Sequence, residues 1–107
     1  MLTEIILVDD FSDKVHLKQK LTDYISKLPR TRLIRNSRRY GLIRSRVIGA
    51  DKAIGEVLVF LDSHCELNKG WVEPLLAPIL QSPETVVAPI LGKVGKSHIL
   101  KKKLKIS

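Results

Sequence analysis

Short apolar runs alternate with segments of helical periodicity along the first ninety residues. Residues 4–8 form an apolar, β-branched run that stops at two aspartates, which predicts a strand buried on both faces. Similar runs predict further strands over residues 31–35, 56–61 and 85–89. Between the runs, apolar positions repeat at helical spacing and predict helices over residues 12–28, 41–53 and 72–80. This alternation predicts an α/β fold, a parallel sheet with flanking helices and right-handed crossovers.

Polar side chains follow the predicted strands at the points where they end. In open α/β sheets, ligands bind at the carboxyl ends of the strands, and this rule selects Asp9, Asp10, Asp62, Ser63 and His64. The first two could bind a ribose or a base, or could cap the following helix near Ser12. In an extended strand end, Asp62 and His64 would point the same way and offer an oxygen and a nitrogen to Mn²⁺ or Zn²⁺. The alternative is a carboxylate that caps the next turn beside an ordinary histidine.

The net charge of +8 is concentrated in two segments. No acidic residue follows Glu84, and residues 93–107 form a lysine-rich tail, which is either a solvated terminus or a patch for nucleic acid or anionic lipid. The second segment holds arginines and no acidic residue: Arg30, Arg32, Arg35, Arg38, Arg39, Arg44 and Arg46. This arginine cluster is either a solvated helix face or an anion site. Arg39 favours the second, because it lies just before a glycine and a helix start.

Several classes of protein lack their main signals here. The single cysteine, Cys65, excludes an intrachain disulfide and a cysteine-cluster zinc site. No apolar run approaches the roughly 20 residues of a membrane span, and the chain as written has no secretory signal. The glycines form neither a dinucleotide fingerprint nor a P-loop. Aromatic residues make up 5% of the chain, which argues against single-stranded nucleic acid as a partner.

Three segments together resemble the catalytic domain of the polypeptide N-acetylgalactosaminyltransferases: EIILVDDFSD, RRYGLIRSRVIGAD and VLVFLDSHCELNKGWVEPLL. The resemblance covers about residues 2–91. It implies a GT-A fold and a retaining, metal-dependent transfer of GalNAc from UDP-GalNAc to Ser or Thr of polypeptides, which starts mucin-type O-glycosylation. It also implies that Asp62 and His64 bind Mn²⁺ and that Asp10, Arg39 and Ser63 bind the donor, with Asp10 at the uridine part. No residue is assigned a catalytic role.

The chain departs from the family's pattern at Tyr40, because the family usually has Glu or Gln before this glycine. We expect residues 1–92 to be the donor-binding half of the domain, without the family's first strand, third metal ligand, acceptor-binding half, lectin domain or membrane anchor. The expected function is a glycosyltransferase fragment that is inactive alone, from a truncated gene product or an incomplete gene model. The alternative is a non-catalytic remnant that binds nucleotide or a partner. The resemblance implies a Golgi location for the family.

Overall fold

The structure, a computed structural model, describes residues 2–89 and 105–106. The chain divides into two units, residues 1–61 and residues 62–107. The predicted tail, residues 93–107, lies outside the described residues except for its short strand at 105–106. The predicted boundary between residues 92 and 93 therefore stays a prediction.

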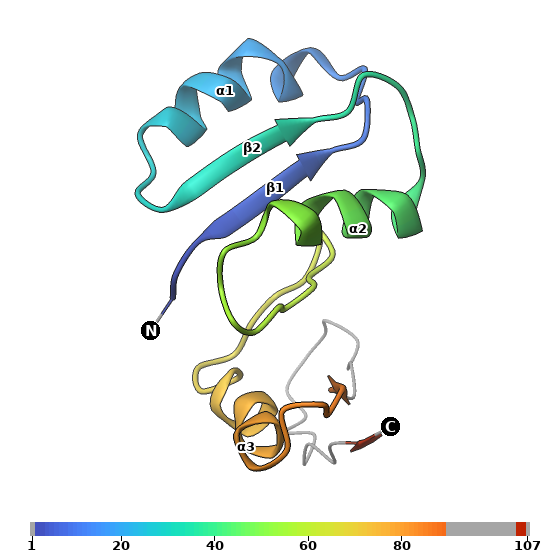
Figure 1. The fold of residues 1–107 in the computed structure, drawn as a ribbon. Helices are drawn as coiled ribbons and strands as arrows, with labels where there is room; N and C mark the ends of the chain where they lie inside the picture. Colours follow the sequence, from blue (N-terminus) through green and yellow to red (C-terminus); the bar gives the residue numbers. More distant parts are fainter. Residues whose placement is uncertain (1, 90–104, 107) are drawn as a thin grey trace, which may run out of the picture. The chain divides into compact units, whose positions relative to one another are not determined.

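A two-stranded parallel sheet forms the centre of the first unit (Figure 1). Strand β1 (Ile5–Asp9) pairs with β2 (Thr31–Arg35), and Leu7 lies opposite Leu33. Both segments are rich in β-branched and apolar side chains, which fit a pleated sheet. The parallel arrangement and the α/β class are confirmed.

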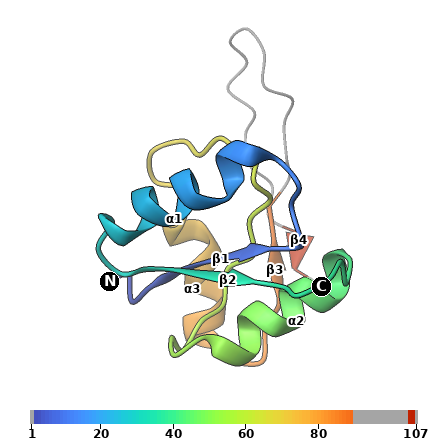
Figure 2. The same cartoon turned by 90° about the horizontal axis from the view of Figure 1, so that it is seen from above.

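Helices cover the two faces of this sheet. The chain crosses from β1 to β2 through the 3₁₀ turn η1 (Val15–Leu17) and helix α1 (Gln19–Ser26), and helix α2 (Leu42–Lys52) follows β2. Figure 2 shows α1 and α2 on opposite faces of the β1–β2 ribbon. A Cβ added at Gly49 would lie 3.1 Å from Val8 Cγ2, so this glycine lets α2 pack closely on β1.

The first helix begins later than its periodicity predicts. The prediction placed its N-cap at Ser12, whereas α1 begins at Gln19 after the separate turn η1. The reason lies in Asp9, whose Oδ1 accepts the backbone N–H of Ser12 at 2.9 Å. Phe11 between them has φ 61°. The carboxylate therefore stabilises a tight turn at the end of β1, and a helix does not start there.

Two expectations about the strands were wrong. Ile5 and Leu7 are 43% and 37% exposed, so β1 is open on one face instead of buried on both. Residues 57–61, the strongest strand signal in the sequence, are not a strand: in the part of the chain that the structure describes, the sheet containing β1 has two strands. An apolar run becomes a strand only where a neighbouring strand accepts and donates its backbone hydrogen bonds, which the pattern alone does not reveal.

The second unit contains helix α3 (Glu73–Gln81) and the short antiparallel strands β3 (Val87–Ala88) and β4 (Lys105–Ile106). Pro74 lies in the first turn of α3, where a missing N–H costs no helical hydrogen bond. The prediction that 85–89 adds to a parallel sheet was wrong, because β3 pairs antiparallel with a segment of the tail. Within the described residues, every helix is too short or too polar to cross a membrane.

Candidate functional site

Asp9 ends β1 as a buried, paired carboxylate. It is 9% exposed, and its Oδ2 forms an ion pair with Arg35, the last residue of β2. Burial raises the pKa of Asp9, but the Ser12 N–H and the Arg35 guanidinium favour the charged form more strongly, so the pKa lies below its usual value. Arg35 also donates to the carbonyl oxygens of Leu17 (2.9 Å) and Lys18 (2.7 Å). The pair therefore ties the end of the sheet to the start of α1.

Asp10 accepts hydrogen bonds from the loop that leads into α2. Its Oδ1 accepts from Asn36 Nδ2 (2.9 Å) and from the Tyr40 N–H (2.8 Å), and its Oδ2 accepts from the Gly41 N–H (2.9 Å). These donors, with the Ser45 hydroxyl, hold the pKa of Asp10 below its usual value. In this structure Asp10 organises the loop, and its predicted contact with uridine stays a prediction.

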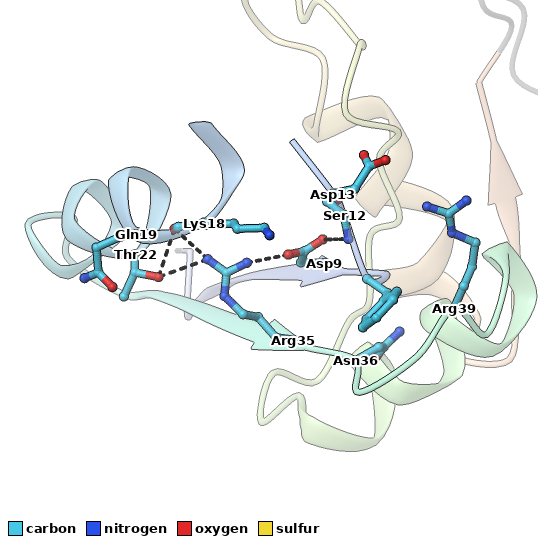
Figure 3. A pocket seen from close by; sticks show the side chains of 10 residues that line it. Asp9, Ser12, Asp13, Lys18, Gln19, Thr22, Arg35, Asn36 and Arg39 are labelled. Carbon is cyan, nitrogen blue, oxygen red and sulfur yellow. Dashed lines mark hydrogen bonds and ion pairs between the residues drawn. The ribbon is translucent and has the colours of Figure 1, made fainter. Parts of the chain in front are cut away.

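A cavity of about 770 Å³ opens at the carboxyl ends of β1 and β2, where the α/β rule predicts a ligand. Its lining residues come from both strand ends, from α1 and from the loop after β2 (Figure 3). Asp9, Ser12, Arg35 and Arg39 are among them, whereas Asp10 is not. The structure thus brings Arg39, one of the predicted donor-binding residues, into this cavity.

Most of the arginine cluster is already engaged by the chain itself. Arg30 donates to a backbone carbonyl oxygen, and Arg32 and Arg35 each pair with a carboxylate. Arg38, Arg44 and Arg46 each lie over an aromatic ring. Within the described residues, Arg39 has no hydrogen bond, ion pair or ring contact. In Figure 3 dashed lines reach Arg35 and none reaches Arg39. Arg39 is therefore the guanidinium of this cluster that is available to an anion in the cavity.

Tyr40, the departure from the family's pattern, binds two neighbouring arginines. The Arg38 and Arg44 guanidinium carbons lie 5.1 and 5.2 Å from the centre of its ring, within the range of cation–π contacts. Hydrogen bonds from Ser37 and Arg38 and the two positive charges lower the pKa of the Tyr40 phenol. Arg38 and Arg44 are therefore already engaged by the Tyr40 ring in the structure without a ligand.

The predicted metal ligands lie in the second unit. The Cys65 N–H donates to the carbonyl oxygen of Asp62 at 3.2 Å, so residues 62–65 form a turn instead of the predicted extended strand end. Ser63 and His64 occupy the central positions of this turn, and the side chains of Asp62, Ser63 and His64 are exposed. Among the described residues, no group of three or more His, Cys, Asp or Glu could hold a metal ion. A carboxylate and an imidazole are ligands that suit Mn²⁺, but two ligands do not complete a site.

Asn36 and Ser45 are the buried polar residues that the sequence analysis missed. They are 8% and 9% exposed, and Asn36 Nδ2 donates to Ser45 Oγ at 3.1 Å. Asn36 directly follows β2, so the rule that selected Asp9 and Asp10 after β1 would also have selected it. Ser45 lies inside a helix, and no local signal marks it.

A parallel β1–β2 pair with helices on both faces and a cavity at the carboxyl ends of its strands defines the chain as an α/β protein. Comparison with known proteins narrows the class. The sequence profile described as glycosyl transferase family 2 matches residues 1–105, and the chain belongs to this family.

Curated relatives agree with the resemblance drawn from the three motifs. The chain is 55% identical over 94 residues to polypeptide N-acetylgalactosaminyltransferase 12 of Mus musculus, which covers 88% of this chain and 16% of that protein. It is 53% identical over 102 residues to polypeptide N-acetylgalactosaminyltransferase 11 of Xenopus tropicalis, covering 94% of this chain and 17% of the relative. The chain thus spans about a sixth of the length of these relatives.

A solved structure gives the same result for the fold. The crystal structure of GalNAc-T7 with UDP, GalNAc and Mn²⁺ superposes on 75% of this chain and 15% of its own, with a TM-score of 0.72 and 50% sequence identity. The expected similarity to the GT-A fold of the polypeptide N-acetylgalactosaminyltransferases is confirmed.

Proposed function

We propose that this chain forms the donor-binding part of a polypeptide N-acetylgalactosaminyltransferase, which transfers GalNAc from UDP-GalNAc to Ser or Thr of polypeptides. The identity of 50–55% with such transferases supports the reaction. The observation that carries the binding role is Arg39, which lines the cavity at the strand ends and has no partner among the described residues. A guanidinium in that position matches a phosphate oxygen in charge and in hydrogen-bonding geometry.

Two residues of the first unit would bind different parts of the donor. Arg39 would donate to the diphosphate. Asp10 would accept a hydrogen bond from the uridine part in addition to those from its three N–H donors. Its present hydrogen bonds also hold the backbone directly after Arg39 in place.

In the second unit, Asp62 and His64 would hold Mn²⁺, and the Ser63 hydroxyl between them would contact the donor. Bound there, the ion would neutralise the negative charge of the diphosphate leaving group. The oxygen and nitrogen ligands fit this ion chemically.

The polypeptide acceptor and a Golgi location are parts of the same proposal. Both are supported by the similarity to polypeptide N-acetylgalactosaminyltransferases, over the sixth of their length that the chain spans. No nucleic acid partner is proposed.

Calorimetric titration of the 107-residue chain with UDP, once with Mn²⁺ and once with EDTA, tests this function. We expect weak, Mn²⁺-dependent binding that is lost in Asp62→Ala. Arg39→Ala should bind at least about tenfold more weakly, because a hydrogen bond to a charged group contributes roughly 1.5–3 kcal/mol. Arg38→Ala is the matched control, since Arg38 is a neighbouring exposed arginine that stacks on Tyr40.

The outcomes separate the candidate functions. Equal affinity in EDTA, or no loss in Asp62→Ala, would refute the metal site and favour the nucleotide-binding remnant. Equal losses in Arg39→Ala and Arg38→Ala would show that the arginines attract UDP only through net charge.

A further inference from the structure

Two buried polar residues of the first unit, Asn36 and Ser45, form a hydrogen-bonded cluster with the half-buried Asp10 at the carboxyl end of the sheet. We define the Asp10 cluster as Asp10, Asn36 and Ser45, which come from the end of β1, the end of β2 and the interior of α2. Asn36 Nδ2 donates both to Asp10 Oδ1 (2.9 Å) and to Ser45 Oγ (3.1 Å). The Ser45 hydroxyl also favours the charged form of Asp10 and so lowers the pKa of this carboxyl. Three elements are thus joined through one amide group.

Because Asn36 and Ser45 are buried, a change in the geometry of this cluster that breaks their hydrogen bonds is costly. Asn36 and Ser45 are 8% and 9% exposed, and no buried side-chain nitrogen or oxygen among the described residues lacks a hydrogen-bond partner. A buried polar group that loses its partner cannot replace it with water, so the satisfied arrangement is favoured over others. The backbone of Asn36 is also held in place, because its N–H donates to the Asp9 carbonyl oxygen at 2.9 Å.

The Asp10 carboxylate connects this cluster to the loop that follows β2 and leads into α2. Asp10 accepts the N–H groups of Tyr40 and Gly41, the two residues that follow Arg39. Gly41 has φ 89°, a conformation that glycine adopts without strain, and it precedes the first residue of α2. The direction of the Arg39 side chain therefore depends on where the Asp10 carboxylate lies.

We propose that Asn36 and Ser45 are positioning residues for donor binding: they orient the Asp10 carboxylate, which fixes the backbone at Tyr40 and Gly41 and so holds Arg39 at the cavity. The inference rests on the proposed function for its last step. Its first steps concern the chain without ligand and can be tested separately.

The first measurement uses NMR of the ligand-free chain. In Asn36→Leu, which removes the amide and keeps the bulk, amide exchange at Tyr40 and Gly41 should speed up by about fivefold or more, the change that corresponds to losing one hydrogen bond. The carboxyl ¹³C signal of Asp10 should titrate at higher pH, because a donor to its charged form is gone. Ser45→Ala should shift both in the same direction by less, and it serves as the second variant if Asn36→Leu does not fold. Ser26→Ala is the matched control, since it deletes an exposed helix hydroxyl that donates to the Asp23 carbonyl oxygen.

The second measurement is the affinity for UDP with Mn²⁺ by calorimetry. Asn36→Leu and Ser45→Ala should lose affinity together with loop protection, whereas Ser26→Ala should lose neither. Unchanged exchange at Tyr40 and Gly41 in both variants overturns the positioning role whatever UDP does. Faster exchange with unchanged UDP affinity overturns the link from the cluster to the donor. If the wild-type chain binds no UDP, the proposed function fails, while faster exchange would still support the effect of the cluster on the loop.

Discussion

Replacing Arg35 by methionine should destabilise the first unit more than any other single arginine substitution. The change removes the cation beside Asp9, whose side chain is 8% exposed, and it removes the donors to Leu17 O, Lys18 O and Thr22 Oγ1. Breaking a buried pair from one side costs about 3–5 kcal/mol. Since the Arg35 side chain is itself 35% exposed, solvent screens part of this interaction, and we expect a loss of about 2–3 kcal/mol.

Urea unfolding followed by far-UV circular dichroism measures this loss. A domain of this size has an unfolding free energy of roughly 5–15 kcal/mol, so the midpoint should fall clearly. Arg44→Met is the control: it removes an exposed arginine that stacks on Tyr40 and should cost less than about 1 kcal/mol. The double variant Asp9→Asn/Arg35→Met should lose less than the sum of the single variants. Additive losses, or an Arg35→Met variant as stable as Arg44→Met, would refute the reasoning.

Two further predictions follow from the site. The lowered pKa of Asp9 stabilises the fold at pH values above its unfolded value of 3.8, so the unfolding free energy should fall as the pH drops from about 5 towards 2. In Asp9→Asn this dependence should flatten, and an unchanged slope would argue against the ion pair. The 107-residue chain should also transfer no GalNAc to a Thr-rich peptide with UDP-GalNAc and Mn²⁺, because retaining transfer needs an acceptor hydroxyl held about 3–3.5 Å from the anomeric carbon. Mass spectrometry would reveal one added N-acetylhexosamine, and such a product that disappears in Asp62→Ala would contradict this expectation.

Local sequence patterns correctly predicted the strands and helices whose formation depends on residues close together in the sequence. The apolar runs of β1 and β2 and the helical spacing of α2 and α3 are such cases, and the structure has all four. The start of α1 was predicted wrongly because Ser12 and Asp13 resemble a helix start, whereas the carboxylate of Asp9 stabilises a turn through the Ser12 N–H. Ser12 could begin a helix or could donate its N–H to Asp9, and the sequence alone does not show which of the two occurs.

Long-range contacts explain the rest of the differences. Residues 57–61 have the composition of a strand, but a strand needs a partner, and the pattern does not say which segment provides it. The Asp10 cluster was missed for a similar reason, since Asn36 lies 26 residues from Asp10 and 9 from Ser45. The arginine cluster was predicted as a group, and only the side-chain contacts separate Arg39 from arginines that are already paired.

Amide chemical-shift mapping of the ¹⁵N-labelled chain with UDP and Mg²⁺, a diamagnetic substitute for Mn²⁺, tests the central claim most directly. If Arg39 and the cavity at the strand ends bind the donor, the largest shifts should occur at Ser12, Asn36 and Arg39, and they should shrink in Arg39→Ala. Shifts confined to the lysine-rich tail, residues 93–107, would show that UDP binds through charge alone and would contradict the account.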